Sequence, residues 1–401
     1  MRQLSKSFFS GLVLLALCAC CLAPGYPETI TLKSGKCISG NITSKEKDCI
    51  KVDVGGVVMT YFLDDIASID DAGGAGKKQT TTVYKVTKTF TLKVLSDVYT
   101  LQFGIPLPRK DIENQTISEA KVFPNSNVYL SDPGGNDVAV FYFSNVKAGK
   151  QIIAGTSYTV AIADLPEIKA DAVSADYGQV AGSLAKYLES EKNMHIKSPA
   201  IEAMVTKEIT EIKNPYIKAK TFYDYIVKNI AYDHDLFIKF LQGYDVTHGE
   251  QSPEETLAKK KGICIDIARL FVVLARASGV PARIVCGIVF SPGHEGAKKD
   301  VTKFGHAWAE IYLPGYGWVA VDPTFGISEK EKFYAFPYRL HLRESYGEID
   351  LQQFGSLTKG WGVMVRVLNK PSRYPVDIDM TVELENMTAD PAAAPEKAKV
   401  N

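Results

Sequence analysis

Apolar and polar residues alternate through the first part of the chain and change to a helical period near residue 170. Residues 28–70 contain short alternating runs, such as Cys49–Val54, that are separated by turn residues. Several strands joined by tight turns in so short a segment predict a small barrel of the SH3-like type. β-branched and aromatic runs recur over 81–168 between prolines and glycines, and their spacing predicts a β-sandwich. The glycine-rich segment 71–80 between them has the composition of a linker.

Helix signals dominate the next part of the chain. Helices are predicted over 172–192 and 198–212 from their apolar spacing. A third helix is expected to begin at Pro215, which follows an asparagine with the character of an N-cap. Ser252 and Glu255 have the spacing of a capping box, in which each side chain satisfies a backbone N–H group at the start of a helix.

The segment 264–278 has the most apolar of the helical patterns. It ends at Gly279, with Pro281 beyond, which is a common stop signal. A helix that is apolar on nearly every side is expected to lie buried at the centre of its domain. Strands are predicted after this helix, over 282–290, 307–313 and 317–321.

The C-terminal part has two further segments. Short strands are expected within an extension over 336–386. Residues 387–401 are rich in alanine, proline and lysine, and this composition predicts a disordered tail.

The first twenty residues have the pattern of an export signal. Two basic residues precede an apolar run that is too short to span a bilayer and that ends in Leu-Cys-Ala-Cys at 17–20. This ending resembles a bacterial lipobox, so we expect cleavage before Cys20, a lipid on Cys20, and an exported protein anchored to a membrane. An ordinary signal peptide cleaved near Ala23 is the alternative. No later apolar run reaches the length of a transmembrane helix, so none is expected.

The overall composition excludes several classes of function. The chain has 46 basic and 46 acidic residues and a formal net charge of zero, which gives it no electrostatic basis for binding nucleic acid. Its apolar content of 46% is that of a folded protein. The histidines lack the spacing of zinc ligands, so we expect no metal and no cofactor. The oligomeric state is left open.

Seven cysteines are distributed unevenly. Three lie in or beside the signal segment, and Cys286 in an apolar strand is expected to be a packing residue. Cys37 and Cys49 flank a predicted hairpin, and in an oxidising compartment they are candidates for a cross-strand disulfide. Two buried free thiols are the alternative.

Cys264 is the candidate nucleophile. It opens the predicted buried helix, where unpaired N–H groups and the positive end of the helix dipole favour a thiolate over a thiol. A thiolate is the nucleophile that acyl transfer requires. Asp266, in the same first turn, is expected to be a capping charge. An inert core thiol is the alternative interpretation of Cys264.

A base and an orienting carboxylate are found further along the chain. His306 begins a predicted strand, and Asp322 ends the strand that returns from the turn at Pro314. Because an antiparallel hairpin brings the far ends of its two strands together, we expect the imidazole and the carboxylate to meet. This is the arrangement of nucleophile, base and orienting group found in catalytic triads, and it favours the catalytic interpretation of Cys264.

At this point the sequence resembles a known family. Gly262-x-Cys264-x-Asp266, the Gly-Val-Pro-Ala-Arg motif at 279–283, His306-Ala-Trp308 and Trp318-x-x-x-Asp322-Pro-Thr are similar, in this order, to the motifs of the transglutaminase-like superfamily of papain-type cysteine enzymes. The likeness covers about residues 170–330. The chain thus resembles members of this superfamily, and we expect it to be a bacterial exported lipoprotein.

The resemblance implies a fold and a set of roles. It implies an α+β core of papain-like type over 169–335, in a multidomain chain, with the barrel and the sandwich before it. It implies that Cys264 is the nucleophile, His306 the base and Asp322 the orienting residue. Tyr232 matches a recurrent tyrosine of the family, for which we expect an oxyanion or pocket role beside the backbone N–H of Cys264. Trp308 is a candidate for the same pocket, and with Trp318 it is expected to form the wall and core of the hairpin.

The expected activity is attack on an amide carbonyl and formation of a thioester at Cys264. Hydrolysis of a peptide or protein substrate in the cell envelope is favoured, because water needs no second binding site. Cross-linking by a protein-glutamine transglutaminase is an alternative within the same chemistry. A non-catalytic envelope module, in which the β-rich segments bind or scaffold, is the alternative of a different class.

Overall fold

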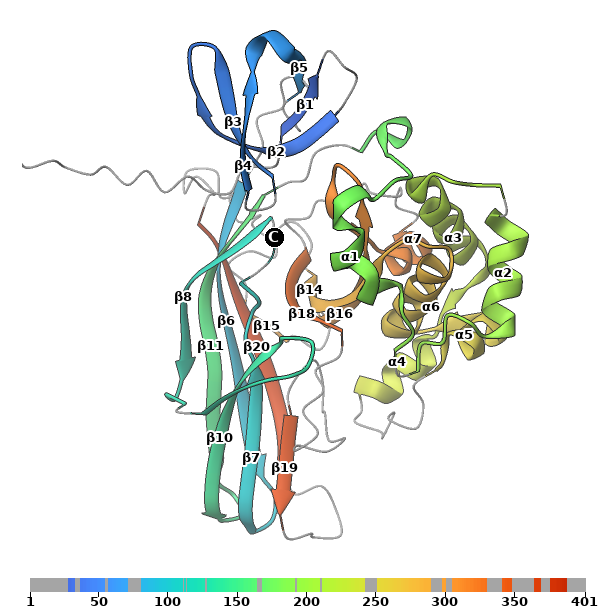
Figure 1. Cartoon of the computed structure of the whole chain (residues 1–401). Coiled ribbons are helices and arrows are strands. Elements are labelled where there is room, and N and C mark those ends of the chain that lie inside the picture. The colour runs from blue at the N-terminus through green and yellow to red at the C-terminus, as the bar shows by residue number, and fades with distance from the viewer. Residues whose placement is uncertain are drawn as a thin grey trace, which may run out of the picture. The chain divides into compact units, whose positions relative to one another are not determined.

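The structure is a computed structural model that describes residues 28–32, 37–54, 57–70, 81–110, 112, 114–126, 128–163, 168–191, 193–209, 211–241, 251–289, 298–300, 305–329, 341–347, 364–368 and 376–387 (Figure 1). The predicted signal peptide with Cys20, the linker 71–80 and all but the first residue of the predicted tail lie outside these residues. The chain divides into two compact units, Met1–Gly74 and Ala75–Asn401.

The first unit is one antiparallel sheet. Its strands are β1 (Glu28–Leu32), β2 (Cys37–Lys45), β3 (Cys49–Val54), β4 (Val57–Phe62) and β5 (Ile66–Asp70), in the order β4-β3-β2-β1-β5. Ile30, Ile50 and Val52 form its small core. Within the described strands the two edges, β4 and β5, are not paired with each other, so the closed SH3-like barrel stays a prediction.

The predicted disulfide between Cys37 and Cys49 is wrong, because Cys49 is a free thiol. The strand register gives the reason. The hairpin of β2 and β3 pairs Lys45 with Ile50 next to its turn, so Cys49 lies at the closed end. Cys37 begins β2 at the open end of the hairpin and pairs there with Thr31 of β1. Two cysteines at opposite ends of a hairpin are too far apart for a sulfur–sulfur bond.

The second unit begins with long strands that form two antiparallel sheets. These strands are β6 (Thr81–Val94), β7 (Val98–Pro106), β8 (Gln115–Phe123), β9 (Val128–Ser131), β10 (Asp137–Val146) and β11 (Gln151–Ala163). The two sheets share one buried apolar cluster, in which the rings of Phe90 and Phe103 meet edge to face at 5.8 Å. Several sheets with helices fit the predicted α+β class, whereas the β-sandwich itself stays a prediction.

Three later strands complete these sheets. They are β15 (Lys298–Asp300), β19 (Met364–Leu368) and β20 (Val376–Asn386), and the sheet orders are β15-β20-β6-β11-β8 and β19-β7-β10-β9 (Figure 1). The segment predicted as a C-terminal extension thus contributes two strands to the sheets that begin at residue 81. Sequence alone did not indicate this, because the pairing joins segments almost 300 residues apart.

The helical part of the second unit surrounds one buried helix. It contains α1 (Ala181–Leu184), α2 (Pro199–Ile209), α3 (Pro215–Asn229), α4 (His234–Leu241), α5 (Pro253–Lys259), α6 (Cys264–Ala277) and α7 (Pro323–Glu329). The N-cap of α3 is Asn214, and the capping box of Ser252 and Glu255 opens α5, as predicted. The predicted helix over 172–192 is instead a series of short turns in which Leu184 is the buried residue of α1.

A four-stranded antiparallel sheet packs against α6. Its strands are β14 (Ala282–Val289), β16 (Gly305–Leu313), β17 (Gly317–Val321) and β18 (His341–Tyr346), in the order β17-β16-β14-β18. α6 contacts β14 and β16, and its apolar side chains fill the core between them. In the described part of the chain, no helix is long and apolar enough to cross a membrane.

Candidate active site

Cys264 is the first residue of α6, and two short strands hold the chain that leads into it. These are β12 (Ala231–Tyr232) and β13 (Lys261–Gly262), which pair in parallel, so Tyr232 lies opposite Gly262. The Cys264 residue is 2% exposed. Its place in the first turn puts the thiol beside the free N–H groups and the positive end of the helix dipole.

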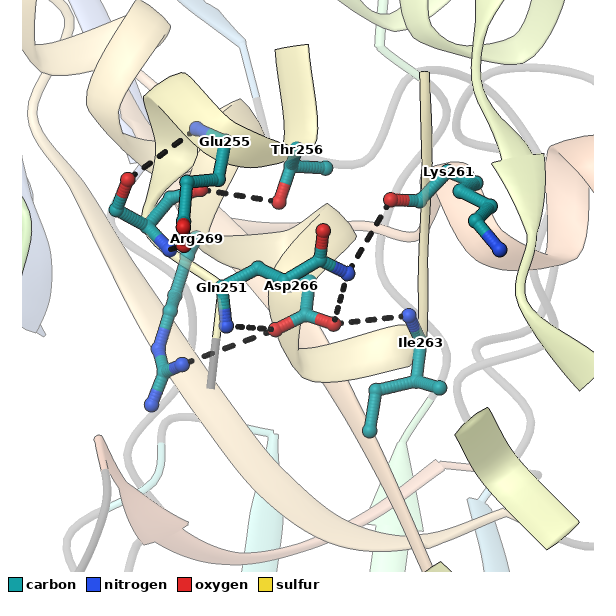
Figure 2. Close-up of polar contacts among 8 residues, drawn as sticks. Gln251, Glu255, Thr256, Lys261, Ile263, Asp266 and Arg269 are labelled. Atoms are coloured by element: carbon teal, nitrogen blue, oxygen red, sulfur yellow. Dashed lines mark hydrogen bonds and ion pairs between the residues drawn. The ribbon is translucent and has the colours of Figure 1, made fainter. Parts of the chain in front are cut away.

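The first turn of α6 is fixed by a buried carboxylate, Asp266 (Figure 2). One carboxylate oxygen accepts a hydrogen bond from the backbone N–H of Ile263 at 3.0 Å. The other accepts from the backbone N–H of Gln251 at 3.3 Å and lies 3.8 Å from the Arg269 guanidinium. Burial raises the pKa of Asp266, against the opposing effect of these contacts. The carboxylate therefore caps the helix, as predicted, and holds the turn that carries Cys264.

Gln251 is a member of this cluster that sequence analysis missed. Its side-chain amide donates to the carbonyl of Lys261 at 3.3 Å and to Asp266 at 3.4 Å, so it joins β13 to the first turn of α6 (Figure 2). Gln251 lies before the capping box of α5, in a position where the sequence carries no motif. The contact arises from the tertiary fold and not from local spacing.

The structure brings His306 and Asp322 together, as the hairpin geometry predicts. β16 and β17 pair Ala309 with Val321, which places the start of β16 beside the residue that follows β17. His306 Nε2 lies 2.7 Å from Asp322 Oδ2, and both residues are buried. The other oxygen, Asp322 Oδ1, accepts a hydrogen bond from the backbone N–H of Phe325 at 3.1 Å.

The charge state of the pair follows from its surroundings. Burial by itself lowers the pKa of His306, but the charge and hydrogen bond of Asp322 and the contact with Cys264 outweigh it and raise the pKa to about 10. Burial raises the pKa of Asp322, and the neighbouring histidines outweigh it and hold that pKa well below its usual range. At neutral pH the pair is an imidazolium and a carboxylate. Since Nε2 contacts Asp322, Nδ1 is the ring nitrogen left for the Cys264 thiol.

Tyr232 lies at the site, beside the start of α6. Its hydroxyl lies close to the backbone N–H of Cys264. Burial, followed by the charges of Cys264 and Asp266, holds the pKa of Tyr232 well above its usual range, so the phenol keeps its proton. The structure therefore brings together the two groups that the sequence and the family resemblance suggest for an oxyanion site.

Trp308 is a buried core residue of the hairpin, which is one of the two roles expected of it, and it is not exposed toward a pocket. The residue is 0% exposed, since it points from β16 into the apolar cluster shared with the β-rich sheets. Its indole lies nearly parallel to the His306 ring, with the centroids 6.1 Å apart, and meets the His341 ring edge-on at 5.0 Å. It packs behind the imidazole and not beside a substrate.

His341, at the start of β18, is a further residue that sequence analysis missed. Its Nε2 lies 3.3 Å from Asp322 Oδ2, the oxygen that also contacts His306. Burial lowers the pKa of His341 more strongly than Asp322 raises it, so the ring is neutral at neutral pH. No motif surrounds this histidine in the sequence, and the pairing of β18 with β14 is what brings it to the site.

The described residues contain no group of three or more His, Cys, Asp or Glu side chains that could hold a metal ion.

Comparisons with known proteins agree on one domain. The family model described as "Transglutaminase-like superfamily" matches residues 203–323, a segment that includes Cys264, His306 and Asp322. An uncharacterised protein of Haemophilus influenzae is 32% identical over 143 residues, which are 32% of this chain and 37% of that protein. A protein-glutamine gamma-glutamyltransferase of Pseudomonas aeruginosa is 32% identical over 77 residues, 17% of this chain and 11% of that protein. The matches thus span well under half the length of either relative.

A solved structure is similar over a larger part of the chain. It belongs to a protein of Cytophaga hutchinsonii that is provisionally named a cysteine protease, and it has a TM-score of 0.51 and 18% sequence identity. The likeness covers 78% of this chain and 93% of that chain. At this level of identity the likeness shows a shared fold.

Proposed function

Because the chain carries a transglutaminase-like domain at residues 203–323, we propose that it is a cysteine enzyme that cleaves or transfers amides through a thioester at Cys264. The observation that carries this proposal is the 2.7 Å contact between His306 Nε2 and Asp322 Oδ2 beside a cysteine at a helix N-terminus. A paired imidazolium is the partner that stabilises a cysteine thiolate.

The first half of the reaction forms the thioester. The Cys264 thiolate attacks the carbonyl carbon of the amide, and the carbonyl oxygen takes up the negative charge. The backbone N–H of Cys264 and the hydroxyl of Tyr232 are the donors available to that oxygen. The His306 imidazolium gives its proton to the departing amine, so the carbon–nitrogen bond breaks and a neutral imidazole remains.

The second half releases the acyl group. The neutral His306 takes a proton from water as the water oxygen attacks the thioester, and the carbon–sulfur bond breaks to restore the thiolate and yield a carboxylic acid. Asp322 keeps the ring oriented through both halves and stabilises its charged form. We favour hydrolysis because it requires no binding site for a second substrate.

Cross-linking of proteins is the second candidate. One of the relatives that match is a protein-glutamine gamma-glutamyltransferase. In that reaction a primary amine replaces water in the second half, so the same three residues serve and a new amide forms. The substrate class proposed for both reactions is a peptide or protein of the cell envelope.

We also propose that the protein is exported and is held to a membrane by a lipid on Cys20. The lipobox-like sequence at 17–20 supports this proposal. Replacement by Cys20→Ser is expected to move the protein from the membrane fraction to the soluble fraction of the envelope. A protein that stays with the membrane after this change would contradict the lipid anchor.

The proposed chemistry is tested by alkylation of Cys264 with iodoacetamide, followed by mass spectrometry of the modified peptide. The wild-type thiol should react rapidly at pH 6–7, and His306→Ala should slow the reaction strongly. Equal, slow labelling of both proteins would favour a non-catalytic envelope module. Incubation with a fluorescent amine and a glutamine-containing peptide then separates the reactions by mass. Transfer replaces the side-chain ammonia of glutamine with the amine, hydrolysis of the side chain replaces that ammonia with water, and hydrolysis of the backbone divides the peptide into two fragments.

A further inference from the structure

His341 contacts the same carboxylate oxygen as His306, from a strand outside the hairpin that carries the other two residues. We propose that His341 is a positioning residue for this site, which fixes the Asp322 carboxylate in the orientation that pairs it with His306. This inference rests on the proposed function of Cys264 for its catalytic meaning. The contact itself does not depend on that function.

The His341 ring is held in place by aromatic neighbours. It is 2% exposed, and it meets the Trp308 indole edge-on at 5.0 Å and the Phe325 ring at 5.6 Å. A ring enclosed in this way has little freedom to rotate, so its Nε2 points steadily at one acceptor. The acceptor is Asp322, whose residue is also 2% exposed.

The hydrogen bonds of the carboxylate show what His341 contributes. Oδ1 accepts from the backbone N–H of Phe325 at 3.1 Å, and Oδ2 accepts from His306 at 2.7 Å and from His341 at 3.3 Å. An ionised carboxylate can only accept, so the neutral His341 ring donates its Nε2–H group. Without that donor, His306 is the one side chain among the described residues that holds Oδ2.

The charged and titratable groups that face His341 in the described residues are Asp322, His306 and Arg343. Arg343 is bound to Asn114 and to Glu310, a carboxylate that Arg283 also binds, and its charge contributes to the lowered pKa of His341. A neutral His341 ring acts directly on His306 only as a dipole, and the two ring centroids are 6.4 Å apart. Asp322 and His306 attract each other as full charges 2.7 Å apart. The orientation of the Asp322 carboxylate therefore affects the pKa of His306 more than the His341 dipole does. Loss of His341 is therefore expected to lower the pKa of His306.

The experiment compares two substitutions of His341 in the full chain carrying Cys264→Ala. His341→Phe keeps an aromatic ring against Trp308 and removes the donor. His341→Gln places an amide N–H near the position of Nε2. The pKa of His306 is read from the Cε1 resonance of labelled histidine by NMR. We expect His341→Phe to lower this pKa by about one unit and His341→Gln to restore most of it.

Two results would overturn the inference. One is a His306 pKa that is the same in His341→Phe and in the parent protein. The other is an equal change in His341→Phe and His341→Gln, since a purely structural role does not distinguish a donor from a ring. If His341→Phe does not fold, His341→Asn replaces it, because its shorter side chain should leave Oδ2 unbound. An Asn variant that matches the Gln variant would then overturn the inference. The exposed His195 supplies the control, as His195→Gln should leave the pKa unchanged.

The titration separates this inference from the proposed function. It is carried out without the Cys264 thiol, so it reports on the contact between His341 and Asp322 even if Cys264 is not a nucleophile. Alkylation of wild-type Cys264 tests the nucleophile by itself. In the active protein the inference further predicts that His341→Phe lowers kcat and leaves KM nearly unchanged, because His341 does not touch the substrate.

Discussion

At the scale of single residues, the charge state of the site depends on Asp322. Asp322→Asn keeps the size of the side chain and removes its charge, so burial becomes the dominant influence on His306 and its pKa should fall below the ordinary value of 6.5. We expect amide turnover to fall on the order of 10³–10⁴-fold, as when a triad loses its carboxylate. Alkylation of Cys264 at neutral pH checks the thiolate directly. Asp171→Asn, at an exposed position, is the control. Unchanged alkylation in a folded Asp322→Asn protein would contradict this account.

The same residues predict how stability depends on pH. The pKa of His306 is about 10 in the folded protein and 6.5 for a free side chain, so the folded state binds the proton more tightly. The stability that this provides is fully present below pH 6.5 and is lost as the pH rises from there to about 10. Urea unfolding at several pH values should show a steeper loss for the wild type than for His306→Gln. If the free energy of unfolding changes with pH in the same way in both proteins, the pKa of His306 is not raised in the folded state.

At the scale of secondary-structure elements, the predictable features are those that depend on residues close together in the chain. Asn214 and the pair Ser252 and Glu255 mark helix starts because capping acts within a few residues. The hairpin that joins His306 to Asp322 is likewise local. The contact of His341 and the place of β20 depend on pairing between distant strands, for which the sequence has no signal. The spacing of His306 and Trp308 places both on one face of β16, but it does not show that the apolar cluster of the β-rich sheets covers the Trp308 side of that face.

The close approach of β14 and β18 allows a test of the element that carries His341. A Cβ atom on Gly287 would lie 2.0 Å from the backbone carbonyl oxygen of Leu342, a contact that side-chain movement cannot relieve. Gly287→Ala must therefore push β18 away from β14, at a cost of about 1–3 kcal/mol in the free energy of unfolding, as for other overpacked sites. It should also weaken the contact of His341 with Asp322. Gly182→Ala has open space around its Cβ and should change stability little. Equal stability of the two variants would contradict the prediction.

At the scale of the whole second unit, β18 connects the candidate site to the β-rich sheets. Glu344 of β18 lies 2.6 Å from Lys88 of β6 and accepts a hydrogen bond from Tyr158 of β11 at 3.2 Å. The connection between β18 and the β-rich sheets thus includes a buried ion pair. Lys88→Met leaves the Glu344 charge buried without its cation and should cost about 3–5 kcal/mol. Adding Glu344→Gln removes that charge and should recover most of the loss. Thermal and urea unfolding measure the stability of the single and the double variant. A Lys88→Met protein as stable as the wild type would contradict the prediction.

The C-terminal strand β20 is expected to be essential for the second unit, even though it lies far along the chain from Cys264. β20 pairs with β6 along its whole length and with β15 on its other side. Its buried side chains, Val376, Met380, Val382 and Leu384, together contribute about 6–12 kcal/mol of apolar burial. That amount is comparable to the whole net stability of a typical domain. A chain that stops at residue 375 should therefore lose cooperative unfolding and the rapid alkylation of Cys264. A chain that stops at residue 387 keeps every pairing of β20 and should retain both. Rapid alkylation of Cys264 in the shorter chain would show that the site forms without β20.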